Sequence, residues 1–275
     1  MSLILILSVC IGMTLGLLGG GGSILAVTVL KYVAGMEAKE AIATSLLVVG
    51  TTAAVGAIQH ARRGNVDFRT GTVFALTAMT GAYGGGHAAN WFEGSTLLIL
   101  FAAMMLTTAV MMFRGRGELA PRESAIPVAI VCVEGIAVGF ITGLVGAGGG
   151  FMIVPALVLL GGMPMHKAVG TSLMIITLKS YSAFVGYVSH VEVNYEMAAA
   201  FTGCAVLGTL VGSGFSHRVP AQTLRKGFAW FVLCMAGFVL AKEVSLLLAL
   251  GVTIPAAGWM AYKARCMASQ QESGS

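Results

Sequence analysis

Lys179 stands near the middle of a long apolar run, eleven residues before His190. A charged side chain at the centre of a membrane costs roughly 2.5–3.5 kcal/mol on insertion scales, so an ionisable residue there marks a functional site by default. An ammonium group in that place has two uses: it binds an anionic substrate directly, or it is neutral and carries a proton. Lys179 is therefore a candidate substrate-binding residue.

Glu134 is a second ionisable residue inside an apolar run, about seven residues after that run begins near Pro127. A carboxylic acid inside a membrane bundle can relay a proton, which makes Glu134 the first candidate for proton coupling. The alternative is a purely structural ion pair between Glu134 and Lys179.

A glycine-rich motif occurs twice, as Gly16-Leu17-Leu18-Gly19-Gly20-Gly21-Gly22-Ser23 and as Gly143-Leu144-Val145-Gly146-Ala147-Gly148-Gly149-Gly150-Phe151. The offset is 143 − 16 = 127, and the same shift pairs Thr44-Ser45-Leu46 with Thr171-Ser172-Leu173 without a gap. It also pairs Gly81 with Gly208, Gly85 with Gly212, and Phe101 with Phe228. We interpret this match as an internal duplication. Lys179 breaks the symmetry, because its counterpart is Thr52.

A helix that restarts after such glycines directs its free N–H groups and positive dipole end at whatever lies before it, which suits an anion. Hydroxyls of the paired Thr-Ser dipeptides, which we expect to open the helices that follow, would add hydrogen bonds to a ligand. The candidate binding residues are Gly19, Gly20, Gly21, Gly22, Ser23, Thr44, Ser45, Gly146, Gly148, Gly149, Gly150, Thr171, Ser172 and Lys179. The alternatives are that the glycines only allow close helix packing and that the hydroxyls bond to their own helices.

The composition places these residues in a membrane. Hydrophobic residues make up 57% of the 275 and charged residues only 10%, with a mean hydropathy of +0.90, which lies outside the range of soluble proteins. We predict an all-α polytopic membrane protein that binds no nucleic acid despite its net charge of +5. The glycine runs lack the Lys-Ser/Thr of a phosphate-binding loop, so we expect no nucleotide cofactor, and no metal-ligand spacing is present.

A helix that spans a membrane needs roughly 20 apolar residues. Ten apolar segments are expected, at 2–18, 23–35, 40–60, 71–90, 95–113, 125–145, 150–162, 167–188, 196–215 and 224–242, with an extra span at 244–262. The segments 23–35 and 150–162 are too short to cross comfortably, so each is a broken helix or re-enters. Backbone freed at membrane depth must line a wet cavity or be buried in protein, and we place the substrate site there.

Basic residues predict the orientation. Arg62, Arg63 and Arg69 follow the third segment, whereas the corresponding loop of the second half, 189–196, has neither Lys nor Arg. Corresponding loops are therefore expected on opposite faces, which predicts two inverted repeats, with the N-terminus outside and the C-terminus in the cytoplasm. The predicted organisation is repeat 1 at 1–113, a cytoplasmic linker at 114–124, repeat 2 at 125–242, and the final span with the tail at 243–275.

Two stretches resemble the motifs of a known family. Gly143-Leu-Val-Gly-Ala-Gly-Gly-Gly-Phe-Met-Ile-Val-Pro155, followed by Ala168-Val-Gly-Thr-Ser172, resembles the sulfite exporter TauE/SafE family, and Gly16 to Ser23 with Ala41-Ile-Ala-Thr-Ser45 resembles its N-terminal motif. The resemblance implies a transporter of the bacterial inner membrane for small sulfur-containing anions such as sulfite, sulfoacetate or other organosulfonates. The first copy departs from the second at Thr28, which stands where the second has Pro155.

We therefore predict a secondary transporter that is not an enzyme. It would bind a small sulfur anion between the glycine breaks and carry it across the lipid bilayer by alternating access, with protons as the candidate coupling ion. The alternative is an anion channel that uses the same glycine-lined cavity. The anion, the direction of transport and the oligomeric state stay open.

A third hypothesis, a membrane enzyme or sulfur-relay protein, would need a reactive cysteine at the cavity. The five cysteines are scattered without a CxxC pair, and we expect small buried side chains instead. Replacing Cys10, Cys132, Cys204, Cys234 and Cys266 together by Ala should leave transport intact in membrane vesicles. Loss of activity in that variant, restored by Cys132 or Cys204 alone, would favour the sulfur-relay hypothesis.

Overall fold

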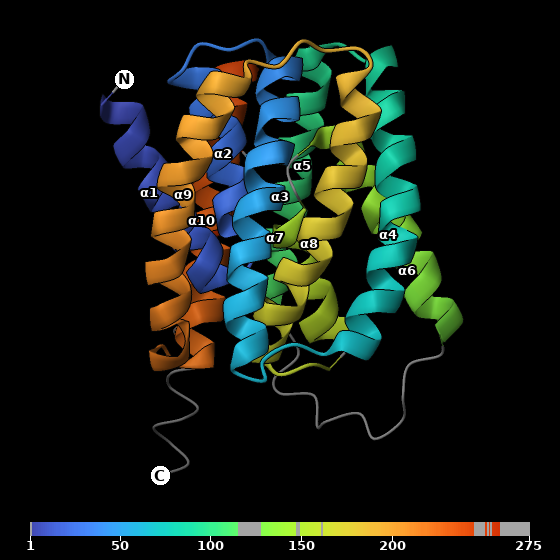
Figure 1. Ribbon diagram of the computed structural model, residues 1–275, viewed down its shortest axis with the longest axis vertical. Helices are drawn as coiled ribbons and strands as arrows, with labels where there is room; N and C mark the ends of the chain where they lie inside the picture. The colour runs from blue at the N-terminus through green and yellow to red at the C-terminus, as the bar shows by residue number, and fades with distance from the viewer. Residues whose placement is uncertain are drawn as a thin grey trace.

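A computed structural model describes residues 2–114, 128–146, 149–160, 162–244, 251, 253 and 255–258, and every regular element within them is a helix (Figure 1). The prediction of an all-α protein is confirmed. The helices are α1 Ser2–Leu18, α2 Gly21–Tyr32, α3 Ala38–Arg62, α4 Phe68–Ala88, α5 Gly94–Arg114, α6 Val128–Val145, α7 Gly150–Pro155, α8 Met165–Val188, α9 Tyr195–Phe215 and α10 Ala221–Glu243. Two 3₁₀ turns, η1 Ala89–Trp91 and η3 Ser216–Arg218, and a π-helical turn, η2 Ala156–Leu160, complete the set.

Four of the described helices are long and apolar enough to cross a membrane by themselves: Ala38–Arg62, Gly94–Met112, Met165–Val188 and Tyr195–Phe215. Shorter apolar helices lie among them, α2 included. The protein is therefore a multi-pass membrane protein. The expected linker falls almost wholly, and the expected extra span at 244–262 largely, outside the described residues.

Helix bounds recur at the offset found in the sequence. Helix α4 begins at Phe68 and α9 at Tyr195, and both end 20 residues later. Their starts are fixed alike, because the side chains of Asp67 and Asn194 accept hydrogen bonds from backbone N–H groups of the first turn. An N-cap at equivalent positions therefore starts the corresponding helix of each half at the same point in the repeat.

Corresponding loops lie at opposite ends of the bundle. In Figure 1, α3 runs from top to bottom and α8 from bottom to top. The backbone N–H of Asp67, before α4, donates to Thr171 in the second turn of α8 (2.9 Å). His190, after α8, instead lies against His87 near the end of α4. The loop before α4 and the loop after α8 therefore lie at opposite ends of the bundle, and the organisation as two inverted repeats stays a prediction.

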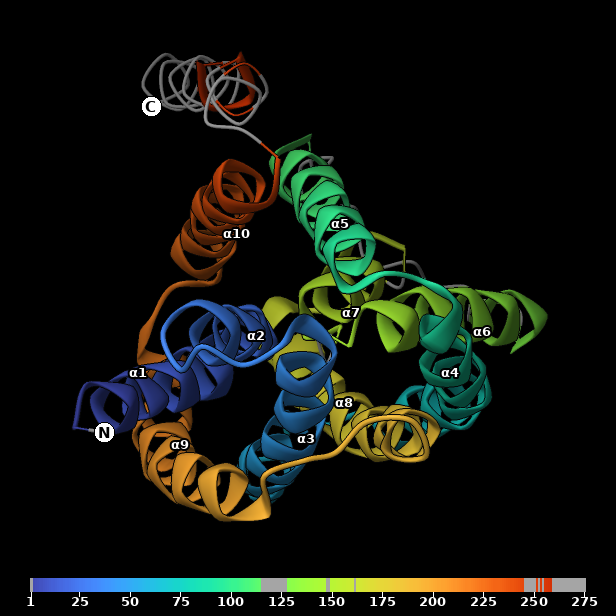
Figure 2. The same cartoon turned by 90° about the horizontal axis from the view of Figure 1, so that it is seen from above.

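The helices form two close pairs on either side of a central group (Figure 2). Helix α1 packs on α9, and α4 packs on α6, with α2, α3, α7 and α8 between the two pairs. Each pair depends on glycines of the fourth helix of a half, α4 in the first half and α9 in the second. A Cβ added at Gly81 or Gly85 would overlap carbonyl groups of α6, and one added at Gly208 or Gly212 would overlap carbonyl groups of α1. Without side chains between them, the backbones touch.

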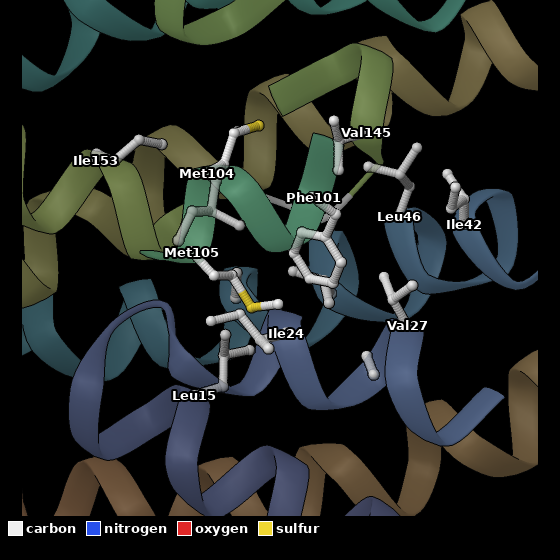
Figure 3. Packing of buried hydrophobic residues seen from close by; sticks show 14 of the residues in the cluster. Leu15, Ile24, Val27, Ile42, Leu46, Phe101, Met104, Met105, Val145 and Ile153 are labelled. Atoms are coloured by element: carbon white, nitrogen blue, oxygen red, sulfur yellow. The ribbon is translucent and has the colours of Figure 1, made fainter. Parts of the chain in front are cut away.

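The apolar core gathers where α5 meets the short helices. Figure 3 shows Phe101 of α5 beside Val27 of α2 and Leu46 of α3, with Val145 of α6 nearby. Phe101 and its counterpart Phe228 on α10 are both fully buried. The duplication thus places one large aromatic side chain in the interior from each half.

The outer surface of the bundle is apolar, as a lipid environment requires. Large side chains such as Ile6, Leu76, Val185 and Leu207 are mostly exposed. Cys10 and Cys234 are exposed as well, whereas Cys132 and Cys204 are half-buried. The expectation of buried cysteines is therefore wrong for Cys10 and Cys234, because small apolar thiols are as compatible with lipid as with a protein interior.

The glycine contacts of α4 predict that alanine substitutions at the adjacent residues Gly84 and Gly85 differ clearly in their effect on stability. Replacing Gly85 by Ala pushes a methyl group into the Phe140 carbonyl, and such overpacking typically costs about 1–3 kcal/mol. Gly84 is the matched control, since a Cβ there meets only the Phe140 ring at 3.8 Å. Thermal melting in detergent should show Gly85→Ala clearly destabilised and Gly84→Ala unchanged or more stable. Equal melting of the two variants would contradict the α4–α6 contact.

Candidate functional site

The two glycine motifs meet inside the bundle. Gly20, which precedes α2, and Gly150, which begins α7, lie backbone against backbone and are both buried. A Cβ on either residue would overlap main-chain atoms of the other. Only glycine permits this crossing, so the contact brings together breaks that are 130 residues apart in the sequence.

Two serine hydroxyls tie each motif to the opposite half. The hydroxyl of Ser172 in α8 lies 3.0 Å from the carbonyl oxygen of Gly19, and that of Ser45 in α3 lies 3.0 Å from that of Gly146. Each hydroxyl shares its proton with a carbonyl oxygen of its own helix at 2.7 Å, that of Val169 for Ser172 and that of Ile42 for Ser45. Donors and acceptors are both related by the 127-residue offset. Gly19 and Gly146 have φ of +72° and +69°, a left-handed conformation that side chains disfavour. Each serine thus satisfies a carbonyl that the break has freed.

Lys179 lies beside this crossing and is only 1% exposed. Its Nζ donates to Oγ1 of Thr142 on α6 (2.6 Å). Within the described residues, no carboxylate lies within ion-pair distance of Nζ. Glu134 stands eight residues before Thr142 on the same helix, about 12 Å along its axis, and makes no ion pair in the part of the chain that the structure describes. The alternative of a Lys179–Glu134 pair is therefore wrong for this conformation.

Gly149 keeps the space next to the ammonium open. It has φ +60°, and a Cβ there would overlap Nζ of Lys179 and the side chain of Thr142. The second glycine motif therefore has two roles: it contacts the first motif, and it leaves space for the Lys179 side chain. Among the expected binding residues, Gly149, Gly150 and Lys179 lie together, and Gly148 lies outside the described residues.

Other predicted residues have packing roles. Gly22 lies against the backbone of α1 at Ile11 and Leu15, and Gly21 lies against the side chain of Leu18. Ser23 donates to the carbonyl of Gly20 within its own turn. For these three residues the structure favours the alternative of close packing and local hydrogen bonding.

The paired threonines differ in their partners. Oγ1 of Thr171 accepts the hydrogen bond from Asp67 N–H, whereas Oγ1 of Thr44 is buried without a hydrogen-bond partner. Neither threonine opens its helix as expected. Helix α3 starts at Ala38 and α8 at Met165, so the Thr-Ser dipeptides lie in the second turn. There the serines reach across to the glycine motifs.

The short segments also differ. Helix α2 is regular throughout, and Thr28 donates to the carbonyl of Ile24 (2.9 Å). Helix α7 is α-helical only to Pro155, where it gives way to the π-helical turn η2. Proline lacks the N–H of a regular helix, which explains the change. The expected distortion at Pro155 is therefore present and takes the form of a wider turn.

One contact was missed by sequence reasoning. Thr142 precedes the second motif by one residue and corresponds to Leu15 in the first half, so the repeat gave no signal for it. Its hydroxyl accepts from Lys179 and donates to the carbonyl of Val138 in its own helix. Only the approach of α6 to α8 in the structure shows that Thr142 contacts Lys179.

Comparison with known proteins agrees with this architecture. The model of the family described as "Sulfite exporter TauE/SafE" matches residues 4–239. The chain belongs to this family. A "Probable membrane transporter protein" of Xylella fastidiosa strain Temecula1 is 34% identical over 246 residues, which is 87% of this chain and 94% of that protein. The "Probable membrane transporter protein YdhB" of Bacillus subtilis is 24% identical over 86% of this chain and 99% of its own length. No solved structure matches the chain significantly.

The reciprocal serine bonds generate a paired prediction. Ser45→Ala and Ser172→Ala should each lower the free energy of unfolding by about 1 kcal/mol, because each leaves a buried glycine carbonyl without its cross-helix donor. Thr177→Val is the control, since Thr177 bonds only to Leu173 of its own helix and should lose little. Thermal melting in detergent measures all three. A TauE/SafE protein whose serine variants melt like the threonine control would not depend on this crossing.

Proposed function

We propose that this chain is a secondary transporter that binds a small sulfur-containing anion, such as sulfite or an organosulfonate, and carries it by alternating access. The observation that supports this most is the Lys179 ammonium, which is buried beside the crossing of two glycine motifs and has no carboxylate near it among the described residues. Family membership supports the transport of a substrate across the membrane. The identity of that substrate is part of the proposal.

The charge of Lys179 supports an anion as the substrate. Burying an ammonium group without an opposite charge is unfavourable, and a hydroxyl such as that of Thr142 compensates only in part. An anion that enters beside Gly149 would supply the missing charge in a medium where Coulomb interactions are strong. The unpartnered hydroxyl of Thr44 is a candidate for a further hydrogen bond to the substrate.

The crossing of the motifs favours a transporter over a channel. A channel needs a continuous path for its ion, whereas the backbones of Gly20 and Gly150 touch and their flanking carbonyls are bonded to the opposite half. Contacts of this kind between the two halves stabilise one conformation. A second conformation would replace them with a different set of contacts. Alternating access uses such a change around a fixed site.

The chemistry of the cargo rests on the family description, sulfite export. Sulfite and sulfonates are compact oxyanions that suit one ammonium donor and a few hydroxyls. We place the protein in the bacterial inner membrane, with the N-terminus outside and the C-terminus inside. Glu134, half-buried on α6, is the candidate proton carrier, at a distance from the lysine.

The test measures thermal stabilisation by the anion and its transport in parallel. Purified protein should melt at a higher temperature with sulfite or a sulfonate than with acetate, since a ligand at 100 times its Kd adds about 2.7 kcal/mol. Lys179→Met should abolish both this shift and uptake into proteoliposomes. Without ligand it should melt no lower than the wild type, because methionine fills similar volume without a buried charge.

Glu134→Gln is the matched control for binding. It should retain the stabilisation by the anion and lose only the response of transport to a pH gradient. Stabilisation by sulfur anions that persists in Lys179→Met would contradict the site. Transport that does not saturate with substrate concentration would indicate the channel.

A further inference from the structure

A pair of histidines joins the two halves of the chain at one end of the bundle. His87 lies near the end of α4, and His190 lies in the loop between α8 and α9. Nδ1 of His87 and Nε2 of His190 are 3.3 Å apart, and the ring centroids are separated by 5.1 Å with 54° between the planes. Both side chains are exposed, so solutes reach them from outside the bundle.

The backbone holds this pair in place. Helices α4 and α8 come close at Gly86 and Gly186, where a Cβ on Gly186 would lie 2.8 Å from the Tyr83 carbonyl oxygen and 3.0 Å from His87 N. The N–H of His190 donates to the carbonyl of Tyr187 (2.9 Å), which fixes the turn after α8. His87 therefore belongs to a packed helix, and His190 lies in the hydrogen-bonded turn that directly follows one. Their separation follows from glycine contacts between two packed helices.

The distance between the two nitrogens matches a metal's coordination shell. Zinc binds imidazole nitrogens at 2.0–2.1 Å with tetrahedral angles, which places two such ligands roughly 3.3–3.4 Å apart. A hydrogen bond between two imidazoles needs one shared proton, and a cation can take that proton's place when both rings are neutral. Binding of one ion requires the two exposed rings to rotate so that both lone pairs point at it.

The charge around His190 also favours a cation. His190 lines a surface cavity of about 530 Å³ with the carboxylates of Glu37, Glu40 and Glu192, and Lys39 is its single ammonium group. A concave surface of negative charge concentrates cations near it. Among the described residues no third His, Cys, Asp or Glu completes a cluster, so two coordination positions would be left to water.

We propose that His87 and His190 form a binding site for a divalent transition-metal ion of the zinc type. The ion would bridge the end of α4 to the loop after α8 and so connect the two halves on the face opposite Arg62 and Arg63. Imidazole nitrogens suit zinc, nickel or copper, whereas calcium and magnesium prefer oxygen ligands. The site is separate from Lys179 and does not depend on the identity of the transported anion.

The test is isothermal titration of zinc into purified protein that carries no polyhistidine tag. The wild type should bind one ion per chain at micromolar zinc. His87→Ala and His190→Ala should each weaken binding by about tenfold or more, since each removes one of two ligands. His166→Ala is the matched control: its Nε2 lies by the Val219 carbonyl near the start of α8, and zinc affinity should be unchanged.

Two further measurements keep the result interpretable. Without zinc, all three variants should have the melting temperature of the wild type, because the substituted side chains are not in the core. If an alanine variant melts at a lower temperature, the His→Gln variant at the same position replaces it and should bind zinc as weakly. Excess calcium should not displace the zinc. Equal zinc affinity in His87→Ala and the wild type, no zinc binding by the wild type, or displacement by calcium would each overturn the proposal.

Discussion

The close contact between Gly20 and Gly150 is the constraint on which the rest of the structure depends. Two helix breaks can lie backbone to backbone only when neither residue has a side chain, and the carbonyls freed beside them must then find donors. Ser45 and Ser172 supply those donors from the opposite half. This one contact therefore accounts for the left-handed glycines at Gly19 and Gly146 and for the serines that reach them from the opposite half.

The position of Lys179 follows from the same contact. The motif that crosses at Gly150 also places Gly149 against Nζ, and α6 brings Thr142 to the other side. Ionisable groups inside a membrane bundle are costly and often mark functional sites, and the ammonium has only a hydroxyl as its partner among the described residues, which is why we propose a ligand there. The proposed site is built on helices, which position side chains more precisely than loops do.

Sequence reasoning succeeded where a pattern is local or repeated. Helix bounds, the glycine motifs, the buried lysine and the distortion at Pro155 all carry such signals. It failed for contacts between distant residues: Ser45 and Gly146 are 101 positions apart, and nothing in the spacing shows that the serine reaches a carbonyl instead of opening a helix. Thr142 and the pair of His87 with His190 were missed for the same reason, because helix approach alone brings them together.

The π-helical turn after Pro155 has a consequence for energetics. Two identical halves in inverted orientation would exchange conformations with no change in free energy, so neither side of the membrane would be preferred. Helix α2 is regular and α7 is not, and the lysine belongs to the second half only. Under the proposed alternating access, the inward-open and outward-open states would therefore differ in free energy, and the chain would prefer one side of the membrane before any gradient acts on it.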